Sequence, residues 1–486
     1  MNYKKFTDKI KSAETLLVLG GLVLLFVYFF VLAYLSKGSS GGADSYVHYR
    51  IARYAYKYPH LLLDLWGKPM FTIFSFPFAQ FGFTGIKVFN ILCALISAWL
   101  CYRISKRLEL KAAPLVIVFV CFAPMYFLTS ISVLTEIAFS LVLILACWFF
   151  MEKKYVWSAL IISLLPFARQ EGIIIIPLFL FLLLVRKQFK AIPFLAFGFL
   201  FFSIIGYFYW HDFLWVIHQS PYTGDVDYYG HGELFHFVKA YKEILGIPLS
   251  ILFVLGIVQL IYKSATFRKN HPYLVEEIIL IFGSAAIYIA GHSYVWWKGI
   301  HGSLGLTRVV AGVIPVMAIV CLEGYNLVRL IFSFHRAAYY TLAIAACIIV
   351  IYVPIDMKLA PIPIGADQEV MEETSAWLEN TSNNNQLIYY YDPYFCYSLH
   401  KDPFDQNVIR EQLPNRENPE QDVPDNSIVI WDAHFGPNEG GMPLKKLTEN
   451  PNFDLLKTFE PKYPIIFFDT VKYEIYVFKK LPQPKH

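Results

Sequence analysis

About eleven apolar segments, each separated from the next by a polar break, fill the first 355 residues of the chain. A helix that crosses a bilayer needs about 20 apolar residues, and several of these segments are shorter, which indicates tilted or protein-shielded helices. Hydrophobic residues make up 57% of the chain and charged residues 16%, a balance that is unusual for a soluble globular protein. The sequence therefore predicts a polytopic α-helical membrane protein. The segments lie near 15–35, 86–104, 113–128, 133–151, 155–168, 172–185, 191–210, 246–262, 274–291, 307–331 and 338–354.

Lysine and arginine gather on one side of these segments. The N-terminal lysines and five further basic clusters, near 103–111, 153–154, 186–190, 263–269 and 329–336, share that side. Because cytoplasmic loops are enriched in Lys and Arg, we expect the N-terminus to be cytoplasmic. The opposite, extracytoplasmic face then receives the long loops 36–85, 211–245 and 292–306. The expected membrane domain covers residues 1–355 and is integral to the cell membrane.

After Pro361 the composition changes abruptly to a polar tail of domain size, residues 361–486. A helix is expected over 366–380, and strands over 386–391, 427–431, 464–468 and 473–478. This alternation predicts a small extracytoplasmic α/β domain. The segment from Trp431 to Gly441 follows a predicted strand at its carboxyl end, which fits either a ligand site or a well-made turn.

Charge and cysteine content exclude several classes of protein. The net charge of +4 is small and the basic residues lie in separate short clusters, so nucleic acid is not an expected partner. Of the seven cysteines, six lie in apolar segments, and no disulfide framework is implied.

Asp44 follows the first apolar segment directly. A carboxylate close to the membrane surface but outside the hydrocarbon stays ionised, and it can accept a proton from a substrate that approaches along the bilayer. The alternative is that Asp44 caps a short interfacial helix that begins at Ser45. His48 lies one helical turn later on the same face, where it either orients an acceptor or sits at the lipid interface.

Glu136 begins an apolar segment just after a short outer turn. It is either a second acid of the site or a carboxylate that stabilises a helix N-terminus, with Thr135 as a possible cap.

Two further breaks carry basic residues toward the outer face. Arg169 offers a planar set of hydrogen-bond donors that suits a phosphate, and Glu171 would hold the guanidinium in place. The alternative is that the two residues form an ion pair that only closes a helical hairpin. Arg308 lies at the outer end of the apolar segment 307–331. Lys298 and His301 precede it in a glycine-rich stretch, and Lys298 has the alternative of reaching out to lipid headgroups.

With these residues in place, the chain resembles the GT-C superfamily of integral membrane glycosyltransferases, which includes protein mannosyltransferases and lipid A aminoarabinose transferases. The resemblance covers roughly 1–355 and rests on the acidic first outer loop at Asp44, the Thr135-Glu136 turn, the Arg169–Gly172 break and the Gly305–Arg308 stretch. It implies that Asp44 is a general base, that Arg169 and Arg308 hold the donor phosphate, and that the donor is a polyprenyl-phosphate sugar. Many members carry two adjacent acids in the first loop, whereas here Ser45 follows Asp44.

The expected function is transfer of a monosaccharide to an acceptor hydroxyl on the extracytoplasmic face, with inversion. The acceptor is a glycan, a lipid or a protein, and membrane lipids are the other partners. No cofactor is required; a divalent metal could neutralise the leaving phosphate, but no acid cluster is dense enough to demand one. A transporter or flippase of lipid-linked glycans would instead need charges near the bilayer midplane and repeated broken helices. A non-catalytic assembly factor of the same fold is the third alternative.

Overall fold

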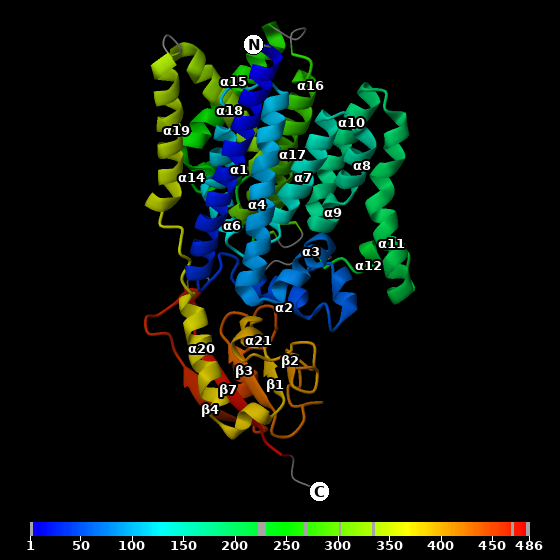
Figure 1. The fold of residues 1–486 in the computed structure, drawn as a ribbon. Coiled ribbons are helices and arrows are strands. Elements are labelled where there is room, and N and C mark those ends of the chain that lie inside the picture. Colours follow the sequence, from blue (N-terminus) through cyan, green and yellow to red (C-terminus); the bar gives the residue numbers. More distant parts are fainter. Residues whose placement is uncertain are drawn as a thin grey trace. The chain divides into compact units, whose positions relative to one another are not determined.

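The computed structural model describes residues 3–221, 230–266, 271–300, 303–332, 336–467 and 471–482. The chain forms two compact units. The first unit consists of Met1–Ser36 and Pro59–Ile362, and the second of Lys37–Tyr58 and Pro363–His486. Figure 1 shows the first unit as helices alone and the second as a sheet with helices against it.

All the secondary structure in the described residues of the first unit is helical. The α-helices are α1 (Tyr3–Leu35), α3 (Pro69–Ala79), α4 (Gly82–Arg107), α5 (Leu115–Cys121), α6 (Pro124–Ser130), α7 (Glu136–Met151), α8 (Tyr155–Ser163), α9 (Leu165–Ala168), α10 (Ile176–Val185), α11 (Phe197–Trp210), α12 (Trp215–His218), α13 (His236–Lys239), α14 (Tyr241–Ile244), α15 (Gly246–Thr266), α16 (Leu274–Glu276), α17 (Gly283–Lys298), α18 (Ile314–Phe332) and α19 (Arg336–Asp356). The 3₁₀ segments are η1 (Pro59–Leu63), η2 (Gln170–Ile175), η3 (Phe189–Ala196) and η6 (Thr307–Val313), and η5 (Glu277–Phe282) is a π-helix.

Six stretches in the described residues are long and apolar enough to cross a membrane: Ala13–Leu35, Gly82–Arg107, Phe189–Trp210, Gly246–Thr266, Leu274–Lys298 and Thr307–Leu330. The chain is thus an integral membrane protein, but the expected count of about eleven spans is not confirmed. The apolar segment 113–128 is broken into α5 and α6, because Pro124 has no backbone N–H to donate and begins a new helix. Residues 292–298 were expected in a loop, but they continue α17.

Burial separates the inner from the outer helices of the first unit. In the span Thr307–Leu330, which contains η6 and most of α18, 94% of the apolar window is buried, against 17% in Ala13–Leu35. Helix α18 packs closely along α15, and α4 packs on α7 and α1. Helix α18 therefore lies in the core, while α1 leaves most of its apolar surface exposed.

The second unit is built on a five-stranded sheet of order β2-β1-β3-β7-β4. Strand β1 runs parallel to both β2 and β3, whereas β7 is antiparallel to β3 and β4. Every residue of β1 and β3 is buried, as expected for parallel strands that are covered on both faces. The strands are β1 (Ile388–Tyr390), β2 (Ile409–Glu411), β3 (Ile428–Asp432), β4 (Phe453–Phe459), β5 (Ile466–Phe467), β6 (Val471–Lys472) and β7 (Ile475–Lys480), and the helices are α2 (Ala43–Tyr54), α20 (Ala366–Glu379), α21 (Tyr394–Ser398), α22 (Lys445–Thr448) and η7 (Ser382–Asn385).

The sequence anticipated much of this unit. Helix α20 and strands β1, β3, β5 and β7 lie within two residues of the expected ranges where these are described, whereas β2, β4 and β6 were not expected. The turn after β3 is well made, because Oδ1 of Asp432 accepts hydrogen bonds from the backbone N–H groups of His434 and Phe435.

The first part of the loop 36–85 belongs to the C-terminal unit, although the sequence assigned it to the membrane domain. Helix α2 packs on α21, where the rings of Tyr46 and Tyr394 meet edge to face with centroids 4.6 Å apart. Arg50 donates to the hydroxyl of Tyr390 and to the carboxylate of Glu411, each at 2.9 Å. These partners, more than 300 residues away in the sequence, bury the aromatic face of α2.

Candidate active site

A cluster of charged side chains in the first unit joins three of the sequence-predicted breaks. Nη1 of Arg169 lies 2.8 Å from Oε1 of Glu136, and its Nε lies 2.7 Å from Oε1 of Glu171. Nε of Arg308 lies 3.7 Å from the same Oε1 of Glu136. One buried carboxylate thereby holds two guanidinium groups side by side. Two carboxylates and two guanidiniums balance in charge, so the cluster can exist away from bulk water.

The turn before α7 fixes the position of Glu136. Asn90, buried in α4, donates both amide hydrogens of its side chain to the carbonyls of Ser132 and Leu134, at 2.7 and 2.8 Å. Thr135 is the residue before the helix, but its side chain makes no cap hydrogen bond. Its hydroxyl instead accepts a bond of 3.1 Å from Nη1 of Arg169. The structure therefore does not show Thr135 as the cap of α7, the possibility that the sequence had left open.

Two glycines let the segments that carry the arginines approach α7. A Cβ atom on Gly172 in η2 would lie 2.9 Å from the ring of Phe139, and one on Gly312 in η6 would lie 2.7 Å from it. Real Cβ atoms do not come so close, so a larger residue at either position would push its segment away. The segments next to Arg169 and Arg308 thus both pack closely on the same aromatic ring of α7.

Helix α17 adds two polar residues that the sequence analysis missed. Tyr288 donates its hydroxyl to Oε1 of Glu171 at 3.4 Å, and Nε2 of His292 lies 3.6 Å from that oxygen. Both residues lie on one face of α17, four positions apart, and their rings touch at a centroid distance of 4.6 Å. Polar residues spaced by four in an otherwise apolar segment were the available signal. Lys68 also interacts electrostatically with Glu171.

The second oxygen of Glu136 marks the cluster as a place for a ligand group. The side chain is 1% exposed, and Oε2 has no hydrogen-bond partner among the described residues. A buried carboxylate oxygen without a donor costs free energy unless something supplies one. The cluster therefore offers one buried acceptor beside two guanidinium groups.

The remaining predicted site residues lie outside this cluster or in the other unit. Asp44 lies in the first turn of α2, which begins at Ala43 with Gly42 before it, so Asp44 is not the cap of a helix beginning at Ser45. Its side chain is half-buried, and His48, four residues on, is buried. Lys298 is exposed at the end of α17 and stacks on Trp297, with Nζ 3.9 Å from the ring centroid. His301 lies outside the described residues.

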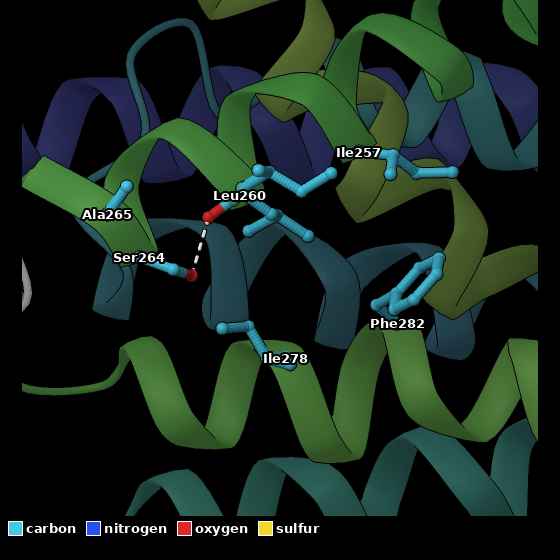
Figure 2. A pocket seen from close by; sticks show the side chains of 7 residues that line it. Ile257, Leu260, Ser264, Ala265, Ile278 and Phe282 are labelled. Carbon is cyan, nitrogen blue, oxygen red and sulfur yellow. Dashed lines mark hydrogen bonds between the residues drawn. The ribbon is translucent and has the colours of Figure 1, made fainter.

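An apolar pocket of about 420 Å³ in the first unit lies between α15 and η5 (Figure 2). Six of its seven lining residues are apolar, and the seventh, Ser264, donates its hydroxyl hydrogen to the Leu260 carbonyl of its own helix at 2.7 Å. Ile278 in its wall is about 20 Å from His292 along the same helical run. The pocket therefore shares no residue with the charged cluster and offers no reactive group. No group of three or more His, Cys, Asp or Glu side chains in the described parts of the chain could hold a metal ion.

Comparison with known proteins gives a fold. No protein-family model matches the sequence, and no curated protein matches it. Among solved structures, ArnT from Cupriavidus metallidurans bound to undecaprenyl phosphate matches 96% of this chain and 98% of its own, with a TM-score of 0.64 and 10% sequence identity. ArnT in the apo state matches 97% and 98%, with a TM-score of 0.62 and 11% identity. The arabinofuranosyltransferase AftD from Mycobacteria matches 95% of this chain and 40% of its own, with a TM-score of 0.56 and 10% identity. The chain is an integral membrane protein with a GT-C-like fold.

Proposed function

We propose that this protein is a membrane glycosyltransferase that moves a monosaccharide from a polyprenyl-phosphate donor to an acceptor hydroxyl. The observation that carries the proposal is the pair of guanidinium groups around Glu136 in a chain whose fold matches ArnT over nearly its whole length. That ArnT structure is bound to undecaprenyl phosphate, and AftD is an arabinofuranosyltransferase. Both point to sugar transfer at a membrane.

Arg169 and Arg308 are proposed to hold the donor phosphate. Guanidinium groups match phosphate oxygens with parallel hydrogen bonds, and Glu136 offsets the repulsion between the two cations. As the bond to the sugar breaks, the phosphate gains charge, and fixed cations stabilise that charge more in the transition state than in the ground state. Glu171, Tyr288 and His292 are positioning residues in this scheme, because they contact Arg169 or its carboxylate partner.

Asp44 is proposed as the general base. The acceptor hydroxyl oxygen attacks the anomeric carbon, its proton passes to the Asp44 carboxylate, and the polyprenyl phosphate leaves with the electrons of the broken bond. A single displacement of this kind inverts the anomeric centre. A positioned base contributes about a hundredfold or more to such a step. His48, one turn further along α2, is proposed to orient the acceptor.

The orientation in the membrane belongs to the same proposal. The N-terminus is cytoplasmic, and the second unit, with Asp44, lies outside the cytoplasmic membrane. The two arginines supply the charge that a metal would otherwise supply, so the reaction needs no divalent ion.

The test is sugar transfer by the purified full chain from polyprenyl-phosphate sugars, with extracted glycolipids and glycans as acceptors. Asp44→Asn should abolish transfer while the thermal unfolding midpoint stays unchanged, and EDTA should leave the wild-type rate unchanged. Asp64→Asn is the matched control, since Asp64 is a carboxylate of the same sequence loop, 36–85, and its Oδ1 accepts a hydrogen bond from the backbone N–H of Gly67. Full turnover by Asp44→Asn would contradict the assignment of the base, and would fit a non-catalytic role for that residue.

A further inference from the structure

The second unit contains a hollow that the reaction scheme above does not use. It lies where α2 packs on α21 and on the loop that follows it, and its volume is about 200 Å³. This is smaller than the ~300–1,000 Å³ of sites for drug-sized ligands, so it suits a single ring-sized group. Every lining residue belongs to the second unit.

Tyrosine rings form much of the wall. Tyr46 and Tyr49 from α2 both face Tyr397 of α21, with ring centroids 5.1 and 5.8 Å apart, and Tyr54 also lines the hollow. Aromatic rings give a flat apolar surface, and tyrosine hydroxyls add polar edges. This combination fits a sugar ring, which has apolar faces and a hydroxylated edge.

The charged groups on the wall all have one sign. Arg50, Arg53 and Lys401 line the hollow together with His400, and no lining residue carries a carboxylate. Arg50 and Arg53 lie three positions apart on α2 and share a face. Glu411 and Tyr390 hold the guanidinium of Arg50 in place from outside the hollow, which preorganises it. Lys401 is partly buried, and its ammonium group donates one hydrogen bond to the Asn384 carbonyl at 3.1 Å, which leaves further N–H donors; burial lowers its pKa, although Glu379 acts in the opposite direction.

We propose that this hollow binds one acidic sugar unit of the acceptor, with its ring against the tyrosines and its carboxylate or phosphate on Arg53 and Lys401. The proposal of an acceptor role rests on the function proposed above. Asp44 and Arg53 lie on the same helix, nine residues or about 14 Å apart along its axis. At about 100° per residue the two side chains leave opposite sides of α2, so the unit held in the hollow is a different one from the unit whose hydroxyl meets Asp44. The acceptor is therefore an acidic saccharide of at least two units.

Direct binding to the full chain in lipid nanodiscs tests this without any transfer reaction. The probes are digalacturonate, maltose 1-phosphate and neutral maltose, followed by saturation-transfer NMR and titration calorimetry. We expect at least one anionic probe to bind with a Kd at least ten times lower than that of maltose, and the probe that does so identifies the anion as carboxylate or phosphate. Arg53→Gln should weaken its binding at least tenfold. Lys446→Gln is the control, because Lys446 pairs with Glu417 in the same unit and does not line the hollow.

Equal binding of maltose and both anions would overturn the proposal, as would unchanged binding by a folded Arg53→Gln protein. If that variant does not fold, Lys401→Gln provides the same comparison. Asp44→Asn separates this proposal from the proposed function, because it should keep the binding of the anionic probe while it loses transfer. Wild-type protein that binds the anion but transfers no sugar would contradict the enzyme assignment alone.

Discussion

Nη1 of Arg169 lies 2.8 Å from Oε1 of Glu136, although the two residues are 33 positions apart and belong to different helical segments. The carboxylate is 1% exposed and the guanidinium 16% exposed, so water solvates neither well. Such a pair persists only when each charge satisfies the other. The stability of the first unit therefore depends on Arg169, which is also proposed to bind the donor.

Removing Arg169 should destabilise the protein as well as weaken donor binding. Arg169→Ala leaves the Glu136 charge buried, which costs about 3–5 kcal/mol, whereas Glu136→Gln with Arg169→Ala removes both charges and should cost less than the sum of the two single changes. Unfolding titrations with SDS measure these free energies. Additive losses would show that the two side chains do not interact.

Arg308 should matter for donor binding. Its Nε lies 3.7 Å from Oε1 of Glu136, beside the guanidinium of Arg169, and two cations placed together suit a phosphate. Arg308→Gln is therefore expected to weaken binding of undecaprenyl phosphate by about 1.5–3 kcal/mol, the range for a hydrogen bond to a charged group. Titration calorimetry checks this. Lys187→Gln, an exposed lysine just after α10, is the control and should leave the affinity unchanged; equal affinity in both variants would count against Arg308 as a donor ligand.

The second unit should lose stability as the pH rises from about 4 to about 7. Burial raises the pKa of Asp432 to about 7 and outweighs the N–H groups of Phe435 and His434, which favour the carboxylate; burial also raises the pKa of Asp392. In this pH range the native chain holds a proton that the unfolded chain, with an Asp pKa near 3.9, has released. The free energy of unfolding must then fall with pH.

Asp432→Asn should flatten this dependence, because the amide keeps an acceptor for the turn and does not titrate. Thermal unfolding midpoints at pH 4.5 to 7.5 measure the effect. Asp454→Asn, on an exposed position of β4, is the control. An unchanged pH slope in Asp432→Asn would show that the Asp432 carboxyl does not cause it.

The membrane orientation can be read with reporters. A fusion after His486 should report the extracytoplasmic side, and a fusion after Lys187, in a basic cluster, should report the cytoplasm. Paired alkaline phosphatase and fluorescent-protein fusions give opposite signals for the two sites. A cytoplasmic signal from the C-terminal fusion would overturn the orientation and, with it, the side on which Asp44 acts.

The sequence by itself determined the features that depend on local pattern. Long apolar segments predicted a membrane protein, and the polar breaks at Glu136, Arg169 and Arg308 stood out because charge near a bilayer is costly. The alternation of strand and helix after Pro361 predicted the α/β unit. Each of these signals is carried by neighbours in the chain, so no tertiary information was needed.

Only the tertiary structure decided which of these residues meet. Glu136 meets Arg169 and Arg308, and the segments next to the two arginines pack on one ring of Phe139. Tyr288 and His292 reach Glu171 from a helix more than 100 positions away. Likewise α2 packs on α21 of the second unit, where Tyr46 contacts Tyr394 and Tyr397, and Arg50 pairs with Glu411 of β2. Such pairings depend on close packing between segments that are far apart in the chain. The local pattern of apolar and polar residues does not show which distant segments pack together.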